Sequence, residues 1–156
     1  SNFHKNNIGT VIKHIPGHGL ANVDSHHFTP IVTSTLKKLI NSDFYPFKDK
    51  KSLFAMTAHI IYNKIDKNNT ATHSKKILEL IRNSIKFNNI IISDDISMKA
   101  LQYSIKENTI KAFGAGCNLV LHCNANYHEM VIVAKNSPKV STFIIKKTSQ
   151  FYKILS

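Results

Sequence analysis

Short apolar runs alternate along the chain with longer segments whose apolar residues recur at helical spacing. Four of the runs are predicted to be strands, and the aliphatic run at residues 90–92 is typical of a strand buried on both faces. They cover about residues 9–13, 53–58, 89–93 and 119–122. Helical spacing is found at about residues 35–43, 74–86, 105–115, 127–135 and 138–155. This alternation predicts βα units around a parallel sheet, with a polar loop at residues 60–72.

Helix boundaries are marked by residues with clear preferences. Ser74 is a good N-cap for the helical segment at 74–86. Gly116 comes directly after the segment at 105–115 and is expected to end it. Pro138 suits the first position of the last helix.

Four βα units amount to half of a (β/α)8 barrel. A four-stranded sheet cannot close at the usual tilt and stagger, so two edges stay open. We therefore expect either an open α/β sandwich or a barrel whose first half is missing. No repeat or linker interrupts the pattern, and the hydrophobic content of 42% supports one core. Residues 1–156 are thus predicted to form a single domain.

Two adjacent carboxylates, Asp94 and Asp95, end the aliphatic run at residues 90–92. Parallel α/β folds place their chemistry at the carboxyl ends of such strands. Adjacent residues on an extended backbone point to opposite sides, so one carboxylate can face a pocket while the other caps the segment after the strand. Taken alone, the spacing also allows a purely structural N-cap for a helix after Met98.

A loop rich in glycine and histidine carries the second group of reactive side chains. Asp24 stands two residues before His26, and in a loop its carboxylate can hold one ring nitrogen. Such support fixes the tautomer and stabilises the imidazolium, so His26 could move a proton near neutral pH. A buried Lys13, at the end of the first strand, could donate to sugar hydroxyls. A polar surface loop is the alternative for Asp24 and His26.

A zinc site is a further interpretation of this loop. Its candidate ligands are His14, His18, Asp24, His26 and His27. Zinc histidines usually recur at fixed spacing on regular elements, whereas these straddle a Gly/Pro turn. We therefore expect no metal, and no cofactor is indicated.

The charge and composition narrow the class of partner. The net charge is +12 and the pI near 9.8, but the lysines are spread along the chain without interleaved aromatic residues. This favours a solvated basic surface and no nucleic-acid partner. No apolar stretch approaches the roughly 20 residues that cross a bilayer, so no membrane partner is expected.

The cysteines and the N-terminus bear on the compartment. Cys117 and Cys123 match no zinc or redox spacing, and we interpret both as buried thiols in a reducing compartment, the cytoplasm. The N-terminal residues lack the pattern of a secretory signal. The chain begins with Ser1 rather than Met, so a fragment or a processed form is expected.

Together the motifs resemble a known family. Residues 13–19 (K-H-I-P-G-H-G) followed by Asp24-Ser25-His26 resemble the K-H-F-P-G-H-G…D-S-H signature of the family 3 glycoside hydrolases that act as β-N-acetylhexosaminidases. Residues 58–62 look like their A-H-V-I-Y segment. Residues 91–98 are similar to their nucleophile strand, and residues 115–121 to the last strand of their barrel.

The resemblance implies a fold, a reaction and a set of site residues. The chain would be the C-terminal half of a (β/α)8 TIM barrel from a cytoplasmic enzyme of peptidoglycan recycling. It would remove terminal N-acetylglucosamine from peptidoglycan fragments with retention of configuration. By position, Asp94 would be the nucleophile and His26 the general acid/base, oriented by Asp24. Lys13 and His14 would contact the bound sugar.

Departures from the family pattern leave alternatives open. Ile15 replaces the usual Phe and Asn118 the usual Asp, and the family's Asp and Arg residues from the first half of the barrel have no counterpart here. The expected partners are therefore a small glycan or muropeptide substrate and a separate N-terminal half-barrel. The alternatives are an inactive half-barrel remnant and a metal-dependent hydrolase that uses the histidine cluster.

Overall fold

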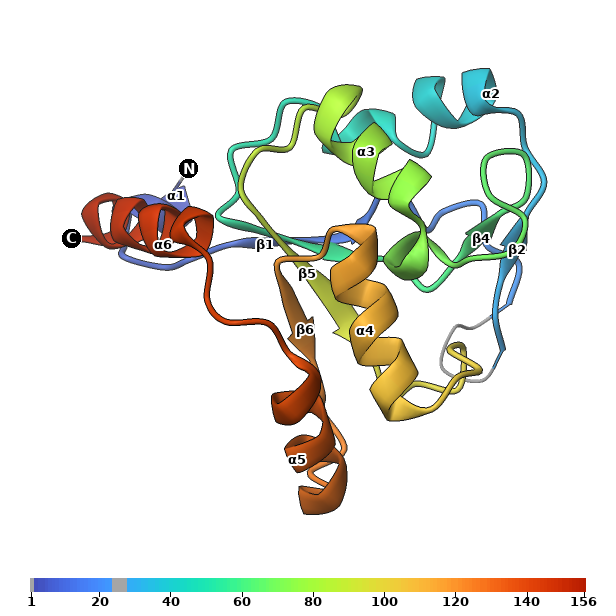
Figure 1. Cartoon of the computed structure of the whole chain (residues 1–156). Helices are drawn as coiled ribbons and strands as arrows, with labels where there is room; N and C mark the ends of the chain where they lie inside the picture. The colour runs from blue at the N-terminus through green and yellow to red at the C-terminus, as the bar shows by residue number, and fades with distance from the viewer. Residues whose placement is uncertain (1, 24–27) are drawn as a thin grey trace.

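Four parallel strands form the central sheet of the computed structural model, which describes residues 2–23 and 28–156 (Figure 1). In order across the sheet they are β1 (Val11–Ile15), β3 (Phe54–Thr57), β5 (Ile90–Asp95) and β6 (Leu119–Leu121). Strands β2 (Ile31–Val32) and β4 (Ile61–Tyr62) pair in a separate parallel ribbon. The sheet confirms the predicted βα units and has the architecture of an open half of a (β/α)8 barrel, with β1 and β6 at its edges.

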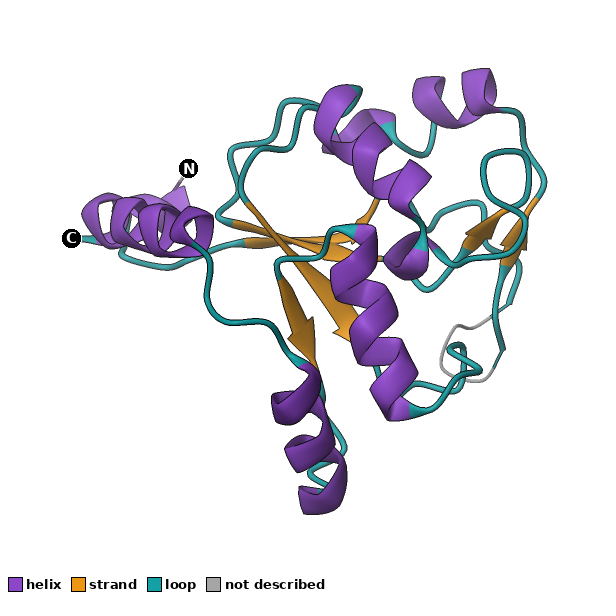
Figure 2. Ribbon diagram, in the orientation of Figure 1, coloured by secondary structure: helices purple, strands orange, loops and turns teal. Residues whose placement is uncertain are grey.

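Helices α3 and α4 lie along one face of the sheet, whereas α6 lies beside α1 at the end where the strands begin (Figure 2). The helical elements, including the 3-10 turns η1 and η2, are α1 (Asn2–Lys5), α2 (Leu36–Asn41), η1 (Tyr45–Phe47), η2 (Ala71–His73), α3 (Lys75–Asn83), α4 (Ile105–Ala115), α5 (Tyr127–Asn136) and α6 (Thr142–Leu155).

Helix caps show which boundary signals were correct. The Ser74 hydroxyl accepts a hydrogen bond from the Ile77 N–H and begins α3, as predicted. Helix α4 ends at Gly116, whose φ of +122° suits glycine. The expectation for Pro138 is wrong, because α6 begins at Thr142 with Ser141 as its N-cap. The loop expected at residues 60–72 is also wrong in part, since it contains β4 and most of η2.

The two faces of the sheet are covered very differently. Ala55 and Ile91 are register partners, and both are buried against a cluster that includes Ile77 and Ile81 of α3 and Ala112 of α4. This face forms the main core. Because alternate side chains of a strand point to opposite faces, the intervening residues belong to the other face, which is the interior side of a barrel.

The interior face is covered mainly by α6, at the end of the sheet where the strands begin, which we call the lower end. Phe151 of α6 packs edge-on against Phe54 with ring centroids 5.2 Å apart. Higher on this face, Lys13 is aligned with Met56, and Met56 with Ile92. Lys13 is exposed there, so the expectation of a buried lysine is wrong. Lys13 is exposed because, among the described residues, no opposing strand packs over this part of the sheet.

The start of β6 is fixed to β5 by Asn118. The Asn118 N–H donates to the Ile91 carbonyl, and its Oδ1 accepts from the Ile91 N–H at 2.9 Å. The same Oδ1 accepts from Arg82 Nη2 at 2.8 Å. The Arg82 Nη1 donates to the carbonyls of Phe87 and Asn89. Asn118 therefore supplies the acceptor that an aspartate would supply, without its charge.

Buried titratable groups stand near the carboxyl end of the sheet. Burial lowers the pKa of His59, and it lowers the pKa of His73 to about 4 with further contributions from His59 and Lys111.

Cys117 is buried as expected, and burial raises the pKa of its thiol to about 12. Cys123 is exposed, so that part of the cysteine prediction is wrong. No helix among the described residues is long and apolar enough to cross a membrane.

Replacing Asn118 by alanine should destabilise the fold. The half-buried Arg82 guanidinium and the Ile91 N–H would each lose an acceptor, at a cost of about 2–3 kcal/mol in the free energy of unfolding. Asn118→Asp is the matched control, because it keeps both acceptors and adds an ion pair with Arg82. Urea unfolding followed by circular dichroism measures both. Equal loss in the two variants would contradict this role for the Asn118 side chain.

The buried histidines should make stability depend on pH. The folded-state pKa of His73, about 4, lies below its unfolded value, so the unfolded chain binds more protons between these two values. Stability is therefore fully present above about pH 6.5 and decreases as the pH falls towards 4. From pH 7 to 5 we expect this residue to account for a loss of about 2 kcal/mol. In His73→Phe the loss over this interval should be smaller by that amount, and an unchanged pH slope would contradict the assignment.

Candidate active site

Asp94, the proposed nucleophile, lies at the carboxyl end of β5 with its side chain 16% exposed. Its Oδ2 is 3.4 Å from Nε2 of His14, which comes from β1 on the far side of β3. Its Oδ1 accepts from the N–H of Asp95 at 2.9 Å. The hydrogen bond to Oδ1 and the imidazole beside Oδ2 orient a carboxylate that solvent can still reach.

The adjacent carboxylate, Asp95, has a structural task. Its Oδ1 accepts from the N–H and the hydroxyl of Ser97 and from the N–H of Cys123, at 2.8 to 3.1 Å. Asp95 thus closes the turn after β5 and holds it to the end of β6. Asp95 therefore has the capping role that the sequence predicted for one of the two carboxylates, although no helix begins directly after Met98.

His14, which the sequence analysis expected to contact a bound sugar, lies beside Asp94. Its side chain is 28% exposed. Burial lowers the pKa of His14 more than Asp94 raises it, and His18, Lys13 and His59 lower it further. At neutral pH the ring is therefore uncharged, and its Nε2 can carry a proton towards Asp94.

The turn after β1 is held by two residues from other segments. The Tyr62 hydroxyl donates to the Gly17 carbonyl, and Asp43 Oδ1 accepts from the Gly19 N–H at 2.9 Å. A Cβ atom at Gly17 would lie 2.5 Å from the Asp43 carboxylate and 2.8 Å from its backbone oxygen. Glycine is therefore required where this turn passes Asp43. The Lys13–His14 and Ile15–Pro16 peptide bonds are both cis.

His59 is a site residue to which the sequence analysis gave no role. Its Nε2 lies 2.9 Å from the Asp95 carbonyl and its Nδ1 2.8 Å from the Thr72 hydroxyl. A carbonyl can only accept, so Nε2 donates and Nδ1 accepts from Thr72. The ring is buried and bridges β3, β5 and η2. Its sequence signals were its place directly after the second predicted strand and its match to the histidine of the A-H-V-I-Y segment.

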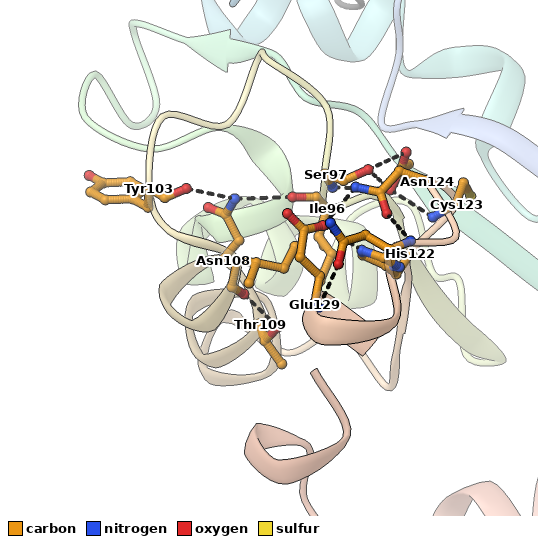
Figure 3. A network of polar contacts seen from close by, with 12 residues as sticks. Ile96, Ser97, Tyr103, Asn108, Thr109, His122, Cys123, Asn124 and Glu129 are labelled. Carbon is orange, nitrogen blue, oxygen red and sulfur yellow. Dashed lines mark hydrogen bonds and ion pairs between the residues drawn. The ribbon is translucent and has the colours of Figure 1, made fainter. Parts of the chain in front are cut away.

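A second histidine with a carboxylate partner lies at the end of β6. His122 Nε2 is 2.8 Å from Glu129 of α5, and Asn124 donates to the same oxygen of Glu129 (Figure 3). These hydrogen bonds hold the pKa of Glu129 below its usual value. Sequence reasoning missed this pair because its partners are seven residues apart across a turn. It shows that the carboxyl end of the sheet carries more polar structure than the motifs alone revealed.

Asp24 and His26 lie outside the described residues, as does His27, so the predicted acid/base and its support have no geometry here. Three of the five ligands of the zinc interpretation also lie outside the described residues. His14 and His18 lie with ring centroids 5.4 Å apart. Within residues 2–23 and 28–156, no group of three or more His, Cys, Asp or Glu residues is placed to hold a metal ion.

The described arrangement suits a nucleophilic carboxylate. Asp94 is oriented, partly accessible and close to an uncharged imidazole. Lys13 adds a cation from the same strand as His14. Such a carboxylate can attack an electrophilic carbon and be displaced again, provided that a second group exchanges protons with the leaving group and with water.

Comparisons with known proteins identify the family of the chain. Residues 1–148 match the model of the glycosyl hydrolase family 3 N terminal domain. A β-hexosaminidase of Actinobacillus pleuropneumoniae serotype 5b is 37% identical over 123 residues, which are 75% of this chain and 36% of that protein. The chain thus spans about a third of the length of the curated relatives it matches.

Two solved structures share the fold and part of the sequence. NagZ from Neisseria gonorrhoeae, in complex with N-trifluoroacetyl-D-glucosamine, has a TM-score of 0.78 and 27% identity, covering 92% of this chain and 42% of that one. Zinc-bound CbsA from Thermotoga neapolitana has a TM-score of 0.79 and 28% identity, covering 96% and 38%. With the family model matched over nearly its whole length, the chain belongs to family 3 of the glycosyl hydrolases and corresponds to part of the family's N-terminal domain.

Proposed function

We propose that this chain carries the catalytic half of a retaining β-N-acetylglucosaminidase. The observation that carries the proposal is the Asp94 carboxylate, held by His14 and the Asp95 N–H at the open end of a parallel sheet. The β-hexosaminidase relatives and the sugar-bound structure of NagZ support the class of substrate.

In the first step one oxygen of Asp94 attacks the anomeric carbon as the bond to the leaving oxygen breaks. The transition state resembles an oxocarbenium ion, and its product is a glycosyl ester of Asp94. Water then attacks the same carbon, the ester bond breaks and Asp94 is released as a carboxylate. The hydrogen bond from the Asp95 N–H to Oδ1 keeps the Asp94 carboxylate oriented through each step.

His26 supplies the proton transfers in this proposal. Its imidazolium gives a proton to the leaving oxygen, and the neutral ring then takes one from the attacking water. Asp24 orients the ring and stabilises its charged form. The support is the match of Asp24-Ser25-His26 to the family signature, and the role of histidine in place of a second carboxylate departs from the common pattern.

The substrate we propose is a terminal N-acetylglucosamine on a peptidoglycan fragment, handled in the cytoplasm. Lys13, exposed on the uncovered face of the sheet, has three donors for sugar hydroxyls. We propose that His14 contacts the same sugar. The exposure of Lys13 leaves this residue accessible to a ligand.

A complementary half-barrel completes the pocket in this proposal. The sheet has four strands with open edges at β1 and β6, and its interior face is covered chiefly by α6 at the lower end. Four further βα units, as another segment or as a separate polypeptide, would pair with both edges and enclose Lys13. An inactive remnant is the outcome if such a half restores no activity.

A metal-dependent hydrolase is the second candidate, favoured by the zinc-bound structure of CbsA. Here His14 and His18 would be ligands, together with residues of the segment 24–27. The two candidates differ in their response to a chelator. Activity that falls with EDTA and returns with zinc would support the metal reaction, whereas activity that EDTA leaves unchanged would support the Asp94 reaction.

Asp94 should become covalently labelled by a slow fluorinated N-acetylglucosaminide. The label accumulates because the fluorine slows release of the ester, whereas a good leaving group keeps its formation fast. Mass spectrometry of the chain, assayed together with a complementary half from a family member, should find one added sugar. Fragmentation of the peptide 87–99 separates the neighbouring carboxylates. Labelling at Asp95 would overturn the assignment, and Asp94→Asn serves as the unlabelled control.

His26→Ala should discriminate between leaving groups. Loss of a general acid typically costs 10²–10⁴ in rate where the leaving oxygen needs a proton. We therefore expect a loss of that order in the glycosylation step on alkyl glycosides or disaccharides, and a much smaller one on aryl glycosides with acidic phenols. Measuring kcat/KM on both classes tests this. Equal losses would remove His26 from the acid role, and His128→Ala on exposed α5 is the control.

A further inference from the structure

A cavity of about 500 Å³ opens at the rim of the sheet, separate from the contact between Asp94 and His14. Its walls come from residues 28–31, from segment 61–73 after β3 and from segment 100–103 after β5. These segments follow the ends of strands, so the cavity lies at the carboxyl end of the sheet, as Asp94 does. We call it the rim cavity. Its volume lies within the range of small-molecule sites.

The described residues that line the rim cavity are polar, aromatic or aliphatic, and none carries a formal charge at neutral pH. No Asp, Glu, Lys or Arg is among the described lining residues. Phe28 presents an aromatic ring that is 68% exposed, and Asn68 and Gln102 present exposed carboxamides. Tyr103 is kept in place by the Lys111 ammonium, 4.3 Å from its ring centroid. An apolar ring beside groups that both donate and accept suits an uncharged ligand with many hydroxyls.

Two buried polar atoms in lining residues lack a protein partner. Thr70 and His73 are each less than a tenth exposed, and among the described residues neither Thr70 Oγ1 nor His73 Nε2 has a hydrogen-bond partner. Both atoms are buried, so they lie behind the surface of the cavity and are not themselves points of contact for an occupant. The contacts offered to an occupant are the exposed ring and carboxamides of the lining.

Hydrogen bonds connect the rim cavity with the strand of Asp94. Thr72 lies between Thr70 and His73 in the chain. Its hydroxyl hydrogen-bonds to His59, which donates to the carbonyl of Asp95. On the other wall, the Asn108 amide donates to the carbonyls of Ile96 and Tyr103 and so ties the segment after β5 (Figure 3). Both walls are thus fixed to the end of the strand that carries the nucleophile.

We propose that the rim cavity is an accessory subsite that binds a neutral sugar unit, of the N-acetylhexosamine class, belonging to the same glycan that is cleaved at Asp94. The proposal rests on the glycosidase function for the identity of the glycan, but the cavity's lining alone selects the ligand class. An uncharged lining favours a sugar over the acidic peptide part of a muropeptide.

Binding can be tested without catalysis. The ¹⁵N-labelled chain with Asp94→Asn is titrated with N,N′-diacetylchitobiose and with N,N′,N″-triacetylchitotriose, and backbone amide shifts are followed by NMR. We expect saturable shifts at Asn68, Gln102 and Tyr103. In the same background Phe28→Ala and Gln102→Ala should each raise the Kd at least fivefold. Tyr152→Ala, at a 77% exposed aromatic residue of α6, should leave the Kd unchanged.

The possible outcomes separate this proposal from the glycosidase function. Saturable shifts at the rim cavity without hydrolysis by the complemented barrel would support the subsite and refute the enzyme. Covalent labelling of Asp94 in the first experiment, together with amide shifts confined to residues near His14 in the titration, would overturn the subsite and leave the glycosidase function supported. Shifts at Gln102 and Tyr103 with a short acidic peptide, but not with the sugars, would overturn the proposed ligand class. The exposed positions of Phe28 and Gln102 keep the variants folded, which the unshifted remainder of the spectrum verifies.

Discussion

Asp95 connects three βα units at the end of the sheet that carries the chemistry. Its carboxylate holds Ser97 and the Cys123 N–H, its carbonyl accepts from His59, and its N–H donates to Asp94. The position of Asp94 therefore depends on a neighbour that is fully occupied with structural hydrogen bonds. Charge-assisted bonds of this kind are the stronger ones in proteins, so the end of β5 is set by a few short contacts rather than by extensive packing.

The sheet separates stability from chemistry. On the face covered by α3 and α4, closely packed aliphatic side chains form the core, and Asn118 with Arg82 fixes the start of β6. On the other face, polar and basic groups reach solvent because only α6 packs there among the described residues, at the lower end. A fold divided in this way can keep its core packed while its other face is free to contact a second surface. The family membership and the intact Asp94 geometry fit that arrangement.

Local signals in the sequence predicted elements, and non-local contacts decided the rest. Helix α4 was predicted to the residue from its helical spacing and from Gly116 at its end, and the capping role of Asp95 followed from strand alternation. The ribbon of β2 and β4 escaped prediction because two residues show no periodicity. The role of His59 needed knowledge of which strands are neighbours. Lys13 was expected to be buried because the pattern of a strand cannot show whether its second face is covered.

The crowding at Gly17 also limits how this chain can change over evolutionary time. A methyl group there meets both the carboxylate and the backbone oxygen of Asp43, so shortening the Asp43 side chain relieves only part of the clash. A side chain at position 17 would therefore require the backbone at Asp43 to shift as well as its carboxylate. In a copy of this gene released from selection, most first changes at codon 17 would thus disturb the turn that carries His18 and Gly19. Glycine at that codon is therefore a sensitive sign, readable from sequence, of whether a given copy is still maintained.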